Sequence, residues 1–155
     1  MQMYICKMLI NPYSSEFFMQ QAYNEAKKAF EKDEVPVGAI VVCDNQIIAR
    51  AHNLTEQLND ATAHAEMLAF TSASDFLGSK YLSECILYVT LEPCCMCAAA
   101  SFWTQLKAIV YAASDKKKGF TSLKKSVLHP KTQVHHGIME YECGKLLTDF
   151  FKKKR

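Results

Sequence analysis

Long hydrophobic runs are missing from this chain of 155 residues, because no stretch approaches the roughly 20 consecutive apolar residues that span a bilayer as a helix. A secretory leader is not expected either, since Lys7 interrupts the apolar residues 1–10 and no plausible cleavage site follows them. A disulfide framework is equally unexpected, because seven cysteines are an odd number. We therefore expect a protein of the reducing cytoplasm.

The sequence also shows no internal repeat and no linker. Its composition, 50% hydrophobic and 22% charged, is that of an ordinary soluble globular protein. The length suits a single domain with its own core.

A strong net charge of one sign is absent too, because 18 Lys and Arg stand against 16 Asp and Glu, a net of +2. Their distribution is uneven, however, since residues 1–100 carry 6 basic against 12 acidic side chains and residues 101–155 carry 12 against 4. The basic residues gather at 116–118, 124–131 and 152–155, as in a phosphate-binding surface. Each cluster alone is more simply a solvated face, and only their joint bias beside a suitable active site favours a nucleic acid partner.

Histidine and cysteine carry the clearest chemical signal. His64, Cys94 and Cys97 are three candidate metal ligands, and three protein ligands are typical of a catalytic zinc, whereas a structural zinc has four. Cys94 and Cys97 are spaced so that a helix places both sulfurs on one face, while Cys95 points elsewhere. Glu66 lies on a different side of its helix from His64, so we expect it to move protons and not to bind the metal.

Two helix starts are predicted at these ligands. Pro93 suits the first turn of the helix that carries the cysteines, and the positive end of that helix favours deprotonated thiols. Thr62 is a plausible N-cap for the helix that carries His64.

Other interpretations of these residues stay open. The Cys-x-x-Cys pair alone suits a redox pair or half of a structural zinc site just as well. The remaining cysteines are candidates to close such a site, although none forms a second close pair: Cys6, Cys43, Cys85 and Cys143. A His-x-Glu pair one helix and one strand before the cysteines favours the catalytic interpretation.

Together, His-Ala-Glu at 64–66 and Pro-Cys-Cys-Met-Cys at 93–97 resemble the signature of the zinc-dependent nucleoside and nucleobase deaminases. The closer resemblance is to bacterial tRNA adenosine deaminases. It extends over EVPVGAIV at 34–41, IARAHN at 48–53, TAHAE at 62–66, YVTLEPCCMC at 88–97 and LLTDFF at 146–151. The ligand motifs specify only the superfamily, and the flanking runs favour the tRNA branch.

The resemblance implies one Zn²⁺ per chain on His64, Cys94 and Cys97, with Glu66 as the catalytic proton shuttle. It implies that Asn53 hydrogen-bonds a flipped purine and that Val37 forms a pocket wall, although Asn53 taken alone suits a turn after a strand. The expected activity is hydrolytic deamination of adenosine to inosine at the wobble position of tRNA anticodons. A homodimer is also implied.

Four residues near the C-terminus are candidate RNA contacts, because aromatic faces stack on unstacked bases and lysines bind phosphates: Phe150, Phe151, Lys152 and Lys153. We expect at least one of the two phenylalanines to pack in the core instead. Because the family pattern begins near residue 16, we expect a mobile extension at 1–14 and a single deaminase domain at 15–155. Three alanines depart from the pattern, where we expect slightly altered packing or pocket shape: Ala61, Ala99 and Ala112.

Hydrophobic periodicity predicts alternating helices and strands. Helices are expected at 15–32, 63–74, 94–104 and 140–153, and strands at 37–43, 46–51, 85–90, 108–112 and 133–138, with a loop at 116–131. This order favours an antiparallel opening hairpin followed by parallel pairing, with helices on both faces of the sheet. The resemblance implies a three-layer α/β/α cytidine-deaminase-like fold with a central mixed five-stranded sheet.

Two rival functions remain. A deaminase of a free nucleobase such as guanine or cytosine would share every ligand, and Asn53 in its context and the Phe-Phe-basic ending argue against it. A non-catalytic, zinc-stabilised RNA-binding module would need neither Glu66 nor an open coordination position.

Overall fold

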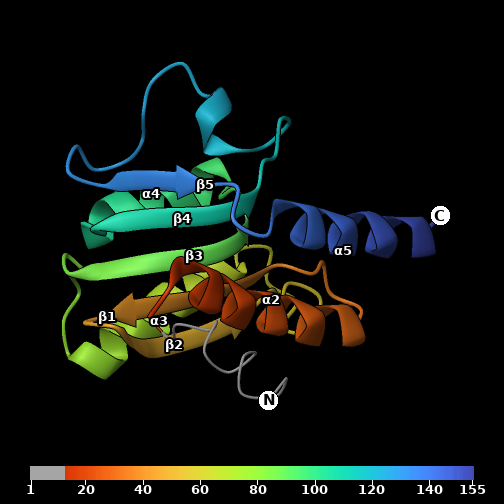
Figure 1. Cartoon of the computed structure of the whole chain (residues 1–155), viewed down its shortest axis with the longest axis horizontal. Coiled ribbons are helices and arrows are strands. Elements are labelled where there is room, and N and C mark those ends of the chain that lie inside the picture. The colour runs from red at the N-terminus through yellow and green to blue at the C-terminus, as the bar shows by residue number, and fades with distance from the viewer. Residues whose placement is uncertain (1–12) are drawn as a thin grey trace, which may run out of the picture.

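The computed structural model describes residues 13–155 (Figure 1), so the extension expected at 1–14 lies almost wholly outside them. The strands are β1 (Gly38–Cys43), β2 (Gln46–His52), β3 (Cys85–Leu91), β4 (Ala108–Ala113) and β5 (Gln133–His136). The helices are α2 (Ser15–Glu31), α3 (Ala65–Leu77), α4 (Cys95–Thr104) and α5 (Glu140–Lys153), and a 3-10 turn, η1 (Phe120–Ser122), lies in the loop after β4. Every predicted helix and strand is present, with ends shifted by at most a few residues.

The five strands form one mixed sheet in the order β2-β1-β3-β4-β5. Strand β1 pairs antiparallel with both β2 and β3, whereas β3 with β4 and β4 with β5 are parallel. We had expected antiparallel pairing only in the opening hairpin. The β1–β3 pair is antiparallel because α3 carries the chain from β2 over β1, so β3 runs parallel to β2 and opposite to the strand between them.

Helices cover both faces of this sheet, which confirms the expected three-layer α/β/α fold (Figure 1). Side chains alternate along each strand, so Ala39 and Val41 of β1 join the core under α3 and α4, while Ile40 and Val42 join the core under α2 and α5. The carboxyl ends of β2, β3, β4 and β5 lie at one edge of the sheet. Loops leaving those ends are therefore brought close together, as is common for ligand sites in open α/β sheets.

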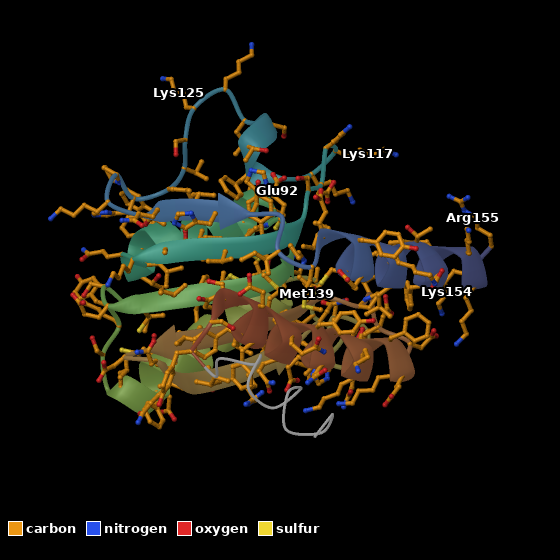
Figure 2. All side chains as sticks on the ribbon, in the orientation of Figure 1. Glu92, Lys117, Lys125, Met139, Lys154 and Arg155 are labelled. Carbon is orange, nitrogen blue, oxygen red and sulfur yellow. The ribbon has the colours of Figure 1, made fainter. Side chains whose placement is uncertain are left out.

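The basic side chains of the C-terminal third extend into solvent (Figure 2). Lys117 and Lys125 come from the loop between β4 and β5, and Lys154 and Arg155 end α5. Lys154 also forms an ion pair with Asp33, which links the end of α5 to the loop after α2. Within residues 13–155, no helix combines the length and the apolar character that crossing a membrane requires.

Close contact between α2 and β1 generates a test of the packing. A Cβ atom at Gly38 would lie 2.0 Å from the backbone oxygen of Ala22 and 2.4 Å from the backbone nitrogen of Ala26. We predict that Gly38→Ala lowers the free energy of unfolding by about 1–3 kcal/mol, because α2 must move off the sheet. Urea unfolding followed by circular dichroism measures the change.

Gly144→Ala is the matched control, because its added Cβ would meet nothing closer than the Ala113 Cβ at 4.0 Å. Alanine is also the better helix former by about 1 kcal/mol, so this variant should be at least as stable as the parent. Equal stability of the two variants would contradict the close approach of α2.

Candidate active site

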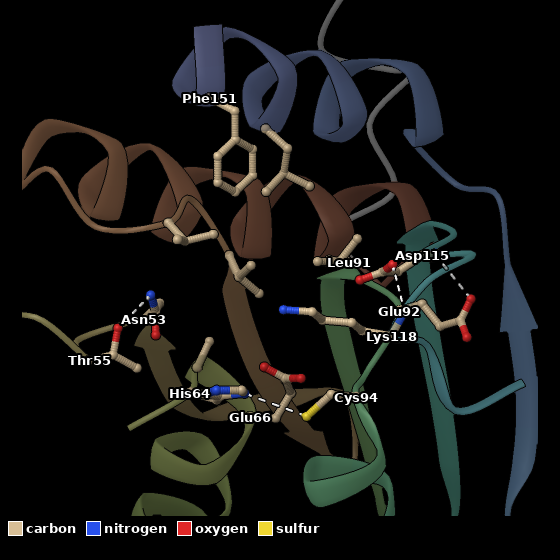
Figure 3. A pocket seen from close by; sticks show the side chains of 14 residues that line it. Asn53, Thr55, His64, Glu66, Leu91, Glu92, Cys94, Asp115, Lys118 and Phe151 are labelled. Carbon is tan, nitrogen blue, oxygen red and sulfur yellow. Dashed lines mark hydrogen bonds between the residues drawn. The ribbon is translucent and has the colours of Figure 1, made fainter. Parts of the chain in front are cut away.

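A pocket of about 310 Å³ opens at the carboxyl ends of β2 and β3 (Figure 3). His64, Glu66 and Cys94 lie along one side of it in this view, and Phe151 of α5 lies on the opposite side. Val37 and Asn53 also line the pocket, so six residues that the sequence singled out meet in one cavity. Segments more than 100 positions apart in the sequence therefore share this cavity.

Three candidate metal ligands meet beside this pocket. The ligand atoms of His64, Cys94 and Cys97 all lie within 4.8 Å of one another. Both sulfurs lie 3.6 Å from Nδ1 of His64, so this ring nitrogen faces the cysteines. Over the part of the chain that the structure describes, these residues form the one group of three or more such side chains able to hold a metal ion.

The other cysteines lie elsewhere. Cys43 and Cys85 face each other across β1 and β3, and Cys143 is buried on α5. None of these three joins the ligand group, and Cys6 lies outside the described residues. Cys95 is exposed and points away from the cluster, as its position in the helix predicted.

Both helices begin at a ligand, in a way that corrects the predicted caps. His64 itself is the N-cap of α3, and the Thr62 hydroxyl instead donates to Oδ1 of Asp60 over 2.7 Å. Cys94 is the N-cap of α4, so Pro93 precedes the helix and does not lie in its first turn. Extended backbone at each N-cap directs the side chain across to the other helix, and the positive helix ends favour negative charge on the sulfurs.

The pKa values of the two thiols are shifted in opposite directions. A hydrogen bond from Cys97, assisted by His64 and opposed by burial, lowers the pKa of Cys94 to about 4. The same bond and burial hold the pKa of Cys97 well above its ordinary range. The hydrogen bond to Cys94 raises the pKa of His64. The cluster therefore already contains one thiolate at neutral pH, the form in which cysteine binds metal.

Glu66 follows in the first turn of α3 and is buried, with 4% of its surface exposed. Burial raises the pKa of its carboxyl group. Its oxygens are not part of the three-ligand group, although the carboxylate contacts Cys97. A buried carboxylate that borders both the ligand cluster and an open pocket is placed to exchange protons with a molecule bound there.

Asn53 is buried directly after β2. Its backbone nitrogen donates to the carbonyl of Val37 over 3.0 Å, and its side-chain Nδ2 donates to Oγ1 of Thr55 over 3.4 Å. The carbonyl oxygen of the Asn53 amide has no hydrogen-bond partner among residues 13–155, so it is free to accept one from a ligand in the pocket.

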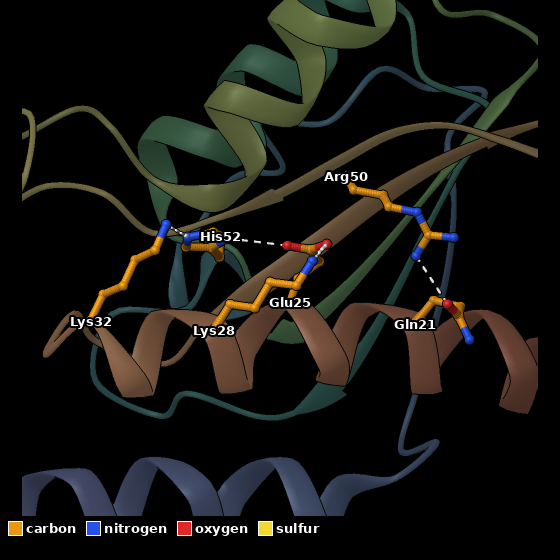
Figure 4. A network of polar contacts seen from close by, with 6 residues as sticks. All are labelled: Gln21, Glu25, Lys28, Lys32, Arg50 and His52. Atoms are coloured by element: carbon orange, nitrogen blue, oxygen red, sulfur yellow. Dashed lines mark hydrogen bonds and ion pairs between the residues drawn. The ribbon is translucent and has the colours of Figure 1, made fainter.

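A polar network secures the strand that carries Asn53 (Figure 4). His52 ends β2, and its Nδ1 lies 3.1 Å from Oε2 of Glu25, a buried residue of α2. Lys28 donates to the other carboxylate oxygen over 2.9 Å. Burial alone would raise the pKa of Glu25, but the hydrogen bonds from Lys28 and His52 lower it overall. The edge strand β2 is thus held to α2 next to Asn53.

The structure corrects one candidate RNA contact. Phe150 is only 4% exposed and packs against Phe30 of α2, with ring centroids 5.9 Å apart, so it cannot stack on a base. Phe151 is 47% exposed and lines the pocket. Lys152 is exposed, and the Lys153 ammonium lies over the Phe30 ring. One of the two phenylalanines is therefore a core residue, as expected.

Several pocket residues were not singled out from the sequence: Thr55, Leu147, Asp115 and, individually, Lys118. Leu147 was detectable, since it lies four positions before Phe151 and so shares its helix face. Lys118 was noted only as part of a basic run, and nothing in that run distinguished it from its neighbours. None of the three alanine departures lines the pocket, and Ala112 is buried in the core under α2 and α5.

Known proteins share this sequence and this architecture. Residues 13–155 match the MafB19-like deaminase family. The tRNA-specific adenosine deaminase of Aquifex aeolicus is 48% identical over 144 residues, which covers 90% of this chain and 95% of that protein. A solved structure from work on A-to-I editing by tRNA:A34 deaminases superimposes with a TM-score of 0.79 at 41% identity, covering 84% of this chain and 98% of the other.

A guanine deaminase from Bacillus subtilis is also similar. Its structure is 40% identical, with a TM-score of 0.63, but the match covers 65% of each chain. The relatives at 42–48% identity over about 90% of this chain are named tRNA-specific adenosine deaminases. This chain belongs to that family, within the MafB19-like deaminases.

Proposed function

We propose that this protein hydrolyses adenosine to inosine at the wobble position of tRNA anticodons. The observation that carries the proposal is a buried carboxylate, Glu66, between a three-ligand cluster and a pocket whose wall holds the Asn53 amide. Relatives that cover about 90% of the chain and are named tRNA-specific adenosine deaminases support the substrate. We place the reaction in the cytoplasm, with residues 15–155 as the single deaminase domain.

The donor set of the cluster fits zinc. One imidazole nitrogen and two sulfurs converge, and the chemistry of these donors is that of a zinc site with a position left for water. His64, Cys94 and Cys97 would hold one Zn²⁺ per chain. Zinc bound there supplies the Lewis acidity that makes water a nucleophile at neutral pH.

The chain's own residues orient the base and move the protons. Glu66 takes a proton from the attacking water and delivers it to N1 of adenine. Glu66 then carries the remaining proton of the added hydroxyl group to the amino group, which leaves C6 as ammonia. The Asn53 amide hydrogen-bonds the purine edge, and Val37 packs against the base. An anticodon-loop adenosine is already partly unstacked, so moving it into the pocket costs less than extrusion from a duplex.

The C-terminal helix extends the pocket toward RNA. Phe151 offers an exposed ring beside the cavity on which a neighbouring unpaired base can stack. Lys152 and Lys153 follow it at the end of α5, where they can approach the backbone phosphates of the same loop.

We predict that the purified protein contains one zinc per chain and that Cys97→Ala loses most of it, because only two ligands remain. Inductively coupled plasma mass spectrometry measures the metal. Cys95→Ala is the matched control, since its thiol is exposed and outside the cluster, and it should keep full zinc. Full zinc in Cys97→Ala would remove this residue from the ligand set.

Glu66→Gln should keep its zinc and lower turnover by at least about 100-fold, because general acid–base catalysis contributes roughly that much or more. The assay counts inosine formed in an anticodon stem-loop that carries ACG. Zinc content and thermal unfolding, both expected to match the parent, control for misfolding. Normal turnover would exclude the proton-shuttle role.

The same assay distinguishes the proposed RNA substrate from a free nucleobase. The similarity to a guanine deaminase makes guanine the free base to offer beside the stem-loop, with cytosine as a further competitor. Ammonia from guanine without inosine in the RNA would replace the proposed activity by free-base deamination.

A second copy of the chain is the partner that we propose besides tRNA. Phe102 and Trp103 of α4 are exposed, Trp103 at 75%, with rings 5.5 Å apart at the end of the helix that begins at Cys94. Large apolar side chains exposed together are typical of an interface. We predict a homodimer by analytical ultracentrifugation and a shift toward monomer in Trp103→Glu, with Tyr141→Glu, equally exposed on α5, as the control. Unchanged assembly in Trp103→Glu would move the interface elsewhere.

A further inference from the structure

Lys118 is the one lysine or arginine among the described residues that line the pocket. It lies on the loop after β4, and its side chain extends from there across the cavity (Figure 3). Its ammonium group has no hydrogen-bond or ion-pair partner among residues 13–155, unlike Lys28, Lys145 and Lys154, which pair with carboxylates. A cation at the mouth of a cavity is thus left available for a ligand.

The loop that carries Lys118 is anchored on the segment between β3 and α4. The buried carboxylate of Glu92 accepts hydrogen bonds from the backbone nitrogens of Asp115 and Thr121, over 3.2 and 3.1 Å, and from the Thr121 hydroxyl over 2.8 Å. Gly119 forms a β-bridge with Cys94. Because the residue after Lys118 pairs with a metal-ligand candidate, the position of the lysine is coupled to that of the cluster.

The backbone N–H groups of Lys117 and Lys118 are already hydrogen-bonded, so the Lys118 side chain is the group available to bind a phosphate. Oδ1 of Asp115 accepts from the backbone nitrogens of Lys117 and Lys118, over 3.1 and 3.0 Å. Those N–H groups are therefore turned toward the loop itself and are not free for an anion. An incoming nucleotide that places its base against Asn53 and Glu66 keeps its phosphates at the pocket mouth, where the Lys118 ammonium is the one cationic donor among the residues that line the pocket.

We propose that Lys118 binds a phosphodiester that flanks the nucleotide in the pocket and so positions its base over Glu66. This inference rests on the proposed function, because it requires an RNA substrate. Lys118 is a positioning residue here, and its contact contributes to substrate binding more than to proton transfer. Losing one charge-assisted hydrogen bond to a phosphate corresponds to about tenfold in affinity.

Lys118→Ala should therefore raise KM for the ACG stem-loop about tenfold while kcat changes less than about twofold. The slope of log(kcat/KM) against log salt concentration should become shallower by about 0.7, the value for one phosphate contact with a single strand. Lys118→Arg keeps the positive charge, so its KM and salt slope should stay close to those of the wild-type protein. Lys80→Ala is the control and should keep KM and the salt slope, because this exposed lysine lies outside the pocket and outside the basic clusters, in the connection from α3 to β3.

A double-mutant cycle identifies the contact. Stem-loops with a neutral methylphosphonate on the 5′ or the 3′ side of the wobble adenosine remove one phosphate charge at a time. With one of them the wild-type protein should lose about tenfold in kcat/KM and Lys118→Ala should lose almost nothing further. If the wild-type protein and Lys118→Ala lose the same factor in kcat/KM at both linkages, the proposed contact between Lys118 and a phosphate is wrong.

The two levels of the proposal fail in different ways. If the wild-type protein forms no inosine in the unmodified stem-loop, the proposed function is wrong and the role of Lys118 is overturned with it. If inosine forms and the effects of Lys118→Ala and the neutral linkages simply add, only the assignment of Lys118 is wrong.

Discussion

The convergence of two helix starts on one point is the constraint on which the rest of the site depends. His64 and Cys94 occupy the N-caps of α3 and α4, where extended backbone lets the imidazole and the thiol reach across to each other. Cys97, one turn into α4, supplies the second sulfur. The positive ends of both helices favour the negative charge that metal-binding thiolates carry.

Buried carboxylates shape the pocket around that cluster in two different ways. Glu34 accepts hydrogen bonds from the backbone nitrogens of Glu56 and Gln57, over 2.8 and 3.1 Å. Glu92 likewise accepts a hydrogen bond from the backbone of the loop after β4. Each thereby braces a loop that leaves the carboxyl edge of the sheet, next to one wall of the pocket. Glu66 is equally buried, and its carboxylate contacts Cys97 of the ligand cluster as well as lining the cavity. Burial and a place in the pocket wall do not by themselves identify the proposed proton shuttle, since Glu92 has both; what distinguishes Glu66 is its contact with the cluster.

Local sequence predicted the elements and the ligand cluster, because periodicity and ligand spacing are local properties. The helix expected at 140–153 has the observed ends, and the cluster follows from the spacing of one histidine and two cysteines. The N-cap at Thr62 and the first-turn position of Pro93 were wrong, because the Thr62 hydroxyl hydrogen-bonds Asp60 and the N-caps are His64 and Cys94. The local sequence could not predict that Lys118 and α5 lie at the pocket, because their positions depend on long-range packing along β4 and α2. Burial of Phe150 against Phe30 is a further consequence of that packing.

The central claim is that the protein supplies three ligands and leaves one coordination position open for the reaction. X-ray absorption at the zinc K-edge of the purified, active protein tests it most directly. The account predicts two sulfurs at about 2.3 Å, one imidazole nitrogen at about 2.0–2.1 Å and one light, exchangeable oxygen or nitrogen scatterer. Three or four sulfurs, or a second imidazole filling the remaining position, would contradict an open site and the hydrolytic chemistry built on it.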